Sequence, residues 1–152
     1  MKFIISLGLI LTLVFGLPFQ EHDTAKLLPI QSLQAEVKEG RVRLVSEAGE
    51  GVGENFLQAV ENLRKKAAGD VFFDTTEHLL LCDARLLPQI LESRLLRPAA
   101  QVYFVSELQE QEGLSDYLAA HPSNLTLASL QAMGRGGYHP PANTYIIMYK
   151  EE

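Results

Sequence analysis

Cysteine is almost absent from this chain of 152 residues, and tryptophan is absent altogether. The single cysteine, Cys82, cannot form an internal disulfide, so no disulfide framework is expected to stabilise the protein. The metal-binding spacings H-x-x-x-H and C-x-x-C are missing, and so is the G-x-S-x-G motif of serine hydrolases. The sequence therefore lacks the most common signs of a metal centre and of nucleophilic catalysis.

Clustered positive charge is missing as well. The chain carries 13 Lys and Arg against 19 Asp and Glu, a net charge of −6. Its longest basic run is Arg64-Lys65-Lys66. Because the phosphate backbone is bound by basic side chains gathered in one place, we expect no nucleic acid partner. With 47% hydrophobic residues, the chain is long enough for one domain with a substantial core.

The longest apolar run lies at the N-terminus. Residues 3–19 carry no charge and follow Lys2, which is typical of an export signal. Two interpretations stay open: a cleaved signal peptide, or an uncleaved membrane anchor, for which the run is near the minimum of roughly 17 residues. Either one places the residues that follow on the outer side of a membrane. We assign 1–20 to the signal peptide or anchor, 21–26 to a linker and 27–150 to a folded domain.

Regular spacing of apolar residues predicts the elements of this domain. Residues 27–37 and 41–46 alternate between apolar and polar, which predicts two strands joined in a hairpin. Apolar residues at helical spacing predict helices over 54–67 and 84–96. Further extended segments are expected over 71–73 with 79–82, 101–106 and 145–149, and further helices over 114–120 and 125–133.

These elements follow one another in the order β-β-α-β-α-β-α-α-β. The order predicts an α/β (α+β) fold, a single layered domain with a mixed sheet and helices packed mainly on one face. An apolar helix at the N-terminus would precede it. Five side chains from the most apolar segments are expected in the core: Phe72, Leu80, Ile90, Tyr103 and Phe104.

His78 and Cys82 are the pair that a catalytic interpretation would use, and both lie in the stretch GDVFFDTTEHLLLC. On a strand, four residues separate the Cα atoms by ~13 Å, which is too far for a thiolate–imidazole pair. We therefore interpret His78 as a half-buried residue that leads into a core strand, and Cys82 as a buried thiol. Pairing any other histidine with a nucleophile requires a fold that the sequence does not reveal.

The segment GEGVGEN, residues 49–55, has glycines spaced as in a phosphate-binding loop before a helix. It lacks the lysine followed by serine or threonine that such loops use, and Glu50 and Glu54 would repel an anion. We interpret it as a flexible turn. The sequence then offers no candidate catalytic, cofactor-binding or metal-binding residue, and we expect no cofactor and no enzymatic activity.

Four segments stand in a fixed order along the chain. They are RVRLVSEAGEG from residue 41, NFLQAVENLRKKAAG from residue 55, VFFDTTEHLLLCD from residue 71 and LLPQILESRLLRPAAQVYFVSE from residue 86. In this order and spacing they resemble the N-terminal domain of the spore-germination receptor C-subunit (Ger(x)C) family. The resemblance extends over about residues 26–149.

The resemblance implies a noncatalytic subunit that acts with two membrane-embedded partners in the germinant receptor of endospore-forming bacteria. Three departures accompany it. No lipid-modified cysteine follows the apolar run, so anchoring would depend on residues 3–19. The family has further domains, so a truncated or repurposed relative is expected. Asp74-Thr75 stands where the family commonly has glycine and histidine.

The expected function is therefore that of a noncatalytic, exported, membrane-associated accessory protein that acts by protein–protein contact in spore germination or sporulation. Its partners would be membrane-embedded receptor subunits or other envelope proteins, and the membrane itself through residues 3–19. Its place would be the outer face of the inner spore membrane or of the cell membrane, or it would be secreted. The alternatives are a small exported hydrolase that uses His78 or His139, and an unrelated cell-envelope binding module.

Overall fold

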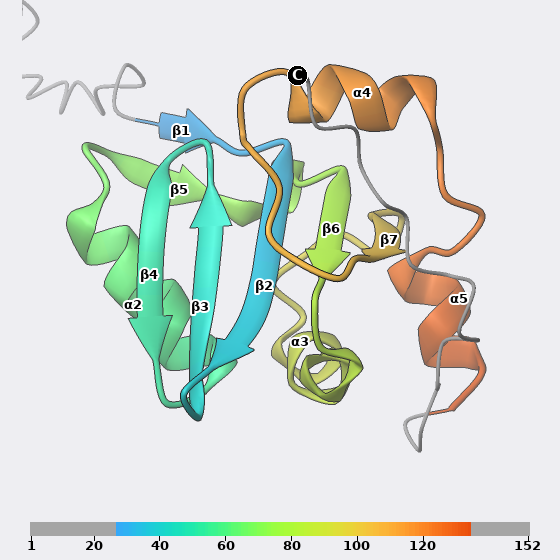
Figure 1. Cartoon of the computed structure of the whole chain (residues 1–152), viewed down its shortest axis with the longest axis horizontal. Helices are drawn as coiled ribbons and strands as arrows, with labels where there is room; N and C mark the ends of the chain where they lie inside the picture. Colours follow the sequence, from blue (N-terminus) through green and yellow to red (C-terminus); the bar gives the residue numbers. More distant parts are fainter. Residues whose placement is uncertain (1–26, 135–152) are drawn as a thin grey trace, which may run out of the picture.

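The computed structural model describes residues 27–134, and the structural statements that follow concern this part of the chain. Its main element is a mixed five-stranded sheet in the order β4-β3-β2-β6-β7 (Figure 1). Strands β2, β3 and β4 are antiparallel, whereas β6 and β7 run parallel to β2. The mixed sheet expected from the sequence is confirmed. The strands are Ser32–Lys38 (β2), Arg41–Ser46 (β3), Gly49–Gly53 (β4), His78–Leu81 (β6) and Gln101–Phe104 (β7).

A second, two-stranded sheet lies beside the first. Its strands β1 (Leu27–Pro29) and β5 (Asp70–Phe72) pair in parallel. The prediction of one strand over 27–37 is therefore wrong, because the chain passes from one sheet to the other at Ile30. Thr75 fixes this passage, since its hydroxyl accepts a hydrogen bond from the Ile30 amide at 3.2 Å. The predicted hairpin is confirmed by the antiparallel pairing of β2 with β3.

The described residues form helices α2 to α5. Helix α2 begins after Asn55, whose side chain accepts a hydrogen bond from the Gln58 amide and so caps the helix. The helix predicted over 84–96 is shorter, because Arg94 adopts the left-handed backbone conformation (φ 52°) that ends α3. The helices are Phe56–Lys66 (α2), Leu87–Ser93 (α3), Leu114–Ala120 (α4) and Leu127–Ala132 (α5).

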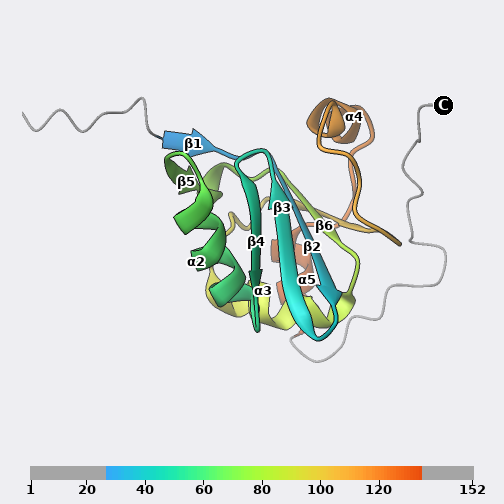
Figure 2. The same ribbon diagram turned by 60° about the vertical axis from the view of Figure 1, so that its left-hand side comes forward.

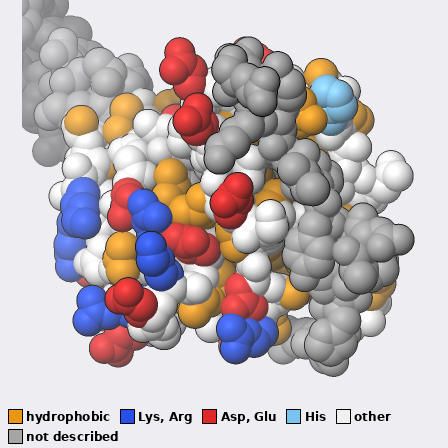
Figure 3. All heavy atoms as spheres, viewed as in Figure 1, with side chains coloured by type: hydrophobic (Ala, Val, Ile, Leu, Met, Phe, Trp, Pro, Cys, Tyr) orange, Lys and Arg blue, Asp and Glu red, His pale blue; other side chains and the backbone are white. Residues whose placement is uncertain are grey.

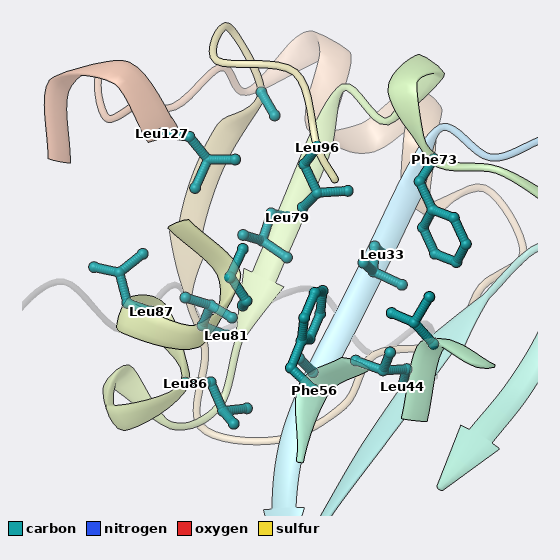
Figure 4. Packing of buried hydrophobic residues seen from close by; sticks show 14 of the residues in the cluster. Leu33, Leu44, Phe56, Phe73, Leu79, Leu81, Leu86, Leu87, Leu96 and Leu127 are labelled. Atoms are coloured by element: carbon teal, nitrogen blue, oxygen red, sulfur yellow. The ribbon is translucent and has the colours of Figure 1, made fainter. Parts of the chain in front are cut away.

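Helices α2, α3 and α5 pack on one face of the five-stranded sheet and form the larger core with it. Figure 4 shows Phe56 of α2 with Leu33 and Leu44 of the sheet on one side, and on the other Leu86 and Leu87, which lie where the 3-10 turn 84–86 meets α3. Helix α4 lies on the opposite face (Figure 2), where Leu118 packs in a smaller cluster with Tyr103. The expected arrangement, with helices mainly on one face, is therefore observed.

Most of the expected core residues are in place, but one is not. Phe72 is 49% exposed, whereas its neighbour Phe73 is buried. The chain enters a 3-10 turn directly after β5, and this turn directs the second ring of the pair into the core. The expected strand over 145–149 and the apolar N-terminal helix lie outside the described residues. The four core predictions that are confirmed are Leu80, Ile90, Tyr103 and Phe104.

The glycine-rich segment 49–53 is strand β4, and its interpretation as a flexible turn is wrong. Gly51 and Gly53 are buried against α2. A Cβ atom on Gly51 would lie 2.6 Å from Leu63 Cβ and would also meet the Ala59 carbonyl oxygen. The absence of these side chains lets α2 lie close to β4, so the glycines serve packing rather than phosphate binding.

Candidate functional site

His78 lies in a buried polar cluster on the face of the sheet that α4 covers. Its side chain Nδ1 is 3.3 Å from the Tyr103 hydroxyl, and the two rings meet edge to face. That hydroxyl donates a hydrogen bond to Gln101 Oε1 at 2.6 Å and accepts one from the Ser123 amide at 3.2 Å. Among the described residues, no hydrogen bond joins the imidazole to a serine hydroxyl or to a thiol. The cluster therefore holds His78 as a packed side chain beside Tyr103.

Cys82 follows the last residue of β6, at the opposite end of the strand from His78. Its thiol is half-buried rather than fully buried. Burial raises the pKa of Cys82 to about 11, and the negative charges of Glu36 and Glu107 add to the effect. Because the thiolate is the nucleophilic form, a thiol in such surroundings is unreactive at neutral pH. The geometry thus separates the two residues that a catalytic interpretation would need together.

The other described histidine is His121, which is exposed at the end of α4. Its Nδ1 lies 2.9 Å from the Tyr117 carbonyl oxygen, and its ring stacks on the Tyr117 ring at 4.3 Å. His22 and His139 lie outside the described residues. Within residues 27–134, no group of three or more His, Cys, Asp or Glu could hold a metal ion. No helix in this range has the length and apolarity needed to cross a membrane.

The segment between β7 and α4 is held across β2 by polar side chains. Gln34 Nε2 donates to the Gln109 carbonyl and Gln34 Oε1 accepts from the Gln109 amide, each at 2.8 Å. Nearby, Ser32 Oγ donates to Glu47 Oε1 at 2.6 Å. These side chains are satisfied by neighbouring protein groups, as buried polar groups must be. They hold the segment before α4 against β2.

The remaining part of the same face, over β2, β3 and β4, carries exposed ion pairs (Figure 3). Arg43 lies in the middle, with Nη1 3.1 Å from Glu36 Oε1 and Nη2 2.8 Å from Glu50 Oε2. Hydrogen bonding to Arg43 lowers the pKa of Glu50. Val45 and Val52 flank the charges and are half-buried. We call these five residues the open face.

The open face contributes little to folding, since partly exposed ion pairs add only about 0–1 kcal/mol to stability. Its charged and apolar side chains instead form a surface on which a partner could bind. The alternation over 41–46 places Arg43 on the face opposite Val42 and Leu44, but its pairing with Glu50 depends on β4 being a strand. The alternation of glycine with Glu50 and Val52 in 49–53 was the signal that could have identified that strand.

One open hollow of about 350 Å³ lies at the C-terminal end of α2. It is lined by Arg64, Gly69, Asp70 and Val71. The lining offers one cationic and one anionic side chain and no nucleophile. Arg64 and Asp70 thus present a cation and an anion at the same hollow.

The His78 imidazole makes stability depend on pH in a defined window. Burial, opposed by Glu77, lowers the pKa of His78 below its ordinary value of 6.5. The unfolded chain therefore takes up this proton at a higher pH than the folded chain, and stability is lost as pH falls below about 6.5. The free energy of unfolding should decline by up to ~1.4 kcal/mol per pH unit.

Urea unfolding between about pH 7 and pH 5 checks this expectation. His78→Gln should reduce the loss of unfolding free energy that occurs as pH falls. The matched change His121→Gln, at the exposed histidine, should leave this loss unchanged. The carboxylates with lowered pKa, such as Glu50, act only at lower pH and do not overlap this window. An unchanged slope in His78→Gln would contradict the burial described here.

Comparisons of the chain with protein families, with curated proteins and with solved structures found no match.

Proposed function

We propose that this chain is a noncatalytic, exported accessory protein of the germinant-receptor C-subunit type, held at a membrane by residues 3–19. The family assignment is supported by the ordered segments between residues 41 and 107. Action by contact is supported by the open face, which is the observation that carries the proposal. The germination or sporulation role follows from the family resemblance alone.

The chemistry of the buried groups supports a noncatalytic role. His78 is engaged by Tyr103, and the raised pKa of Cys82 keeps its thiol protonated. A general base must lie within hydrogen-bond reach of the group whose proton it takes, and among the described residues the His78 imidazole is hydrogen-bonded to the Tyr103 hydroxyl instead. This contact supports a noncatalytic role over a hydrolase that uses His78.

The open face supports contact with a folded partner. Arg43 between two carboxylates forms a charge pattern that an apposed surface can match, and such complementarity gives specificity more than raw affinity. The half-buried Val45 and Val52 add apolar surface beside it. We propose that a membrane-embedded receptor subunit binds here.

Affinity purification of the full chain from membranes of sporulating cells tests the proposal. The two membrane-embedded receptor subunits should be recovered together with the chain. Recovery of cell-wall or soluble envelope proteins without these subunits would instead support the unrelated envelope-binding module. In that case the receptor assignment would be wrong.

A further inference from the structure

Phe72 is exposed although it was expected in the core, and other apolar residues are exposed beside it. The parallel register of the small sheet pairs Phe72 with Pro29, and Leu27 with Asp70. Paired residues of neighbouring strands share a face, and residues two apart share it too. Leu27, Pro29 and Phe72 therefore lie on one outward face, which they share with Asp70, and we call these three apolar residues the outer patch. Leu27 is 51% and Phe72 49% exposed.

The outer patch is fixed by the residues around it. The Thr75 hydroxyl lies 2.7 Å from the Phe72 carbonyl oxygen and accepts a hydrogen bond from the Ile30 amide. The next ring along the chain, Phe73, is buried, with the Arg64 guanidinium 5.1 Å from its centroid. Because Thr75 is hydrogen-bonded to the Phe72 carbonyl and Phe73 is packed in the core, the fold directs the Phe72 ring outward.

The patch lies where the chain continues toward the apolar run 3–19. In Figures 1 and 2, β1, β5 and the C-terminal end of α2 lie together at one corner of the domain. Seven connecting residues, 20–26, span at most about 25 Å. An apolar run placed in a membrane would therefore keep Leu27 close to the bilayer surface.

We propose that the outer patch inserts into the interfacial region of a phospholipid bilayer and orients the domain on it. The inference rests on the proposed function, which places residues 3–19 in the membrane. Apolar and aromatic side chains on a rigid element bind such an interface in proportion to the area they bury. The open face, on the large sheet, would then remain available to a protein partner.

The charges around the patch indicate the kind of lipid. Helix α2 ends in Arg64, Lys65 and Lys66, and Lys65 is paired with Glu61 at 2.7 Å. The hollow next to the patch presents Arg64 and Asp70 together. A zwitterionic headgroup such as phosphoethanolamine carries a phosphate that Arg64 would bind and an ammonium that Asp70 would bind.

The absence of native tryptophan gives a direct test in the full chain. Phe72→Trp places a single fluorophore on the patch, and the matched variant Leu57→Trp places one at an exposed apolar position at the other end of α2. Each is bound to phosphatidylethanolamine-containing vesicles with and without brominated acyl chains. Phe72→Trp should shift its emission to shorter wavelength and lose emission to bromine, and Leu57→Trp should do neither.

The other outcomes distinguish membrane anchoring through residues 3–19 from docking of the outer patch on lipid. If the chain floats with the vesicles but both variants behave alike, the patch does not dock, and the anchoring remains. If the chain does not float with the vesicles, anchoring through residues 3–19 fails and the docking proposal fails with it. A blue shift of Phe72→Trp that appears without lipid and grows with protein concentration would mean that a second copy covers the patch, which overturns the lipid proposal.

Discussion

Phe104→Ala should reduce the free energy of unfolding by ~3–5 kcal/mol, the usual cost of removing a buried phenyl ring. Phe104 is 1% exposed and belongs to the larger core, although β7 is the last strand of the sheet. The outer edge of β7 is covered by the segment before α5, because the Val102 amide donates to the Leu125 carbonyl at 2.9 Å. An edge strand is thus packed as tightly as a central one.

Chemical denaturation monitored by circular dichroism measures this loss. It is a large part of the ~5–15 kcal/mol that holds a domain of this size folded. Leu57→Ala, at an exposed leucine, is the matched control and should change stability by no more than about 0.5 kcal/mol. A comparably small effect at Phe104 would mean that β7 does not pack against the core.

Gly51→Ala should destabilise the domain by about 3 kcal/mol, at the upper end of the cost of overpacking. The added methyl group would meet Leu63 Cβ at 2.6 Å and also the Ala59 carbonyl oxygen. The second contact is with helix backbone, so no change of side-chain rotamer can relieve it. Helix α2 would have to move away from β4, and the side-chain Nδ2 of Asn62 would lose its 2.8 Å hydrogen bond to the Val52 carbonyl oxygen.

Gly40→Asn is the control for this change. Gly40 sits in the β2–β3 turn with a φ of 74° and open space around it, and asparagine tolerates that backbone conformation. The control should therefore unfold at nearly the same denaturant concentration as the unmodified chain. Equal stability of Gly51→Ala would show that α2 does not lie against β4 as described.

Local patterns in the sequence predicted the elements well where one face is buried. Val42 and Leu44 alternate with outward arginines in β3, and Phe56 with Val60 and Leu63 marks the buried side of α2. The division of 27–37 into two strands was not predictable, since it depends on the hydrogen bond between Thr75 and Ile30, which are far apart in sequence. Local spacing contains no information on such a contact.

The side-chain environments were less predictable than the elements. The spacing of His78 and Cys82 correctly indicated that they do not pair, because strand geometry is fixed by the backbone. The partner of His78, Tyr103, was not identified, since it depends on the register between β6 and β7. The Phe72-Phe73 pair shows the same limit: both rings are equally apolar, and only the turn after β5 decides which one is buried.

The central claim is that the chain acts through its surface, and in particular through the open face. The most direct test of this claim compares three variants, Arg43→Glu, Arg85→Glu and Cys82→Ala. The quantity measured is how much of the two membrane-embedded receptor subunits each variant recovers. Arg85 is exposed and pairs locally with Asp83, so it serves as the charge-reversal control. Loss of a complementary charge contact should lower recovery about tenfold in Arg43→Glu, equivalent to ~1.4 kcal/mol, with a native circular dichroism spectrum. The two other variants should recover the subunits as the unmodified chain does. Full recovery with Arg43→Glu, or its loss with Cys82→Ala in a folded protein, would contradict the account.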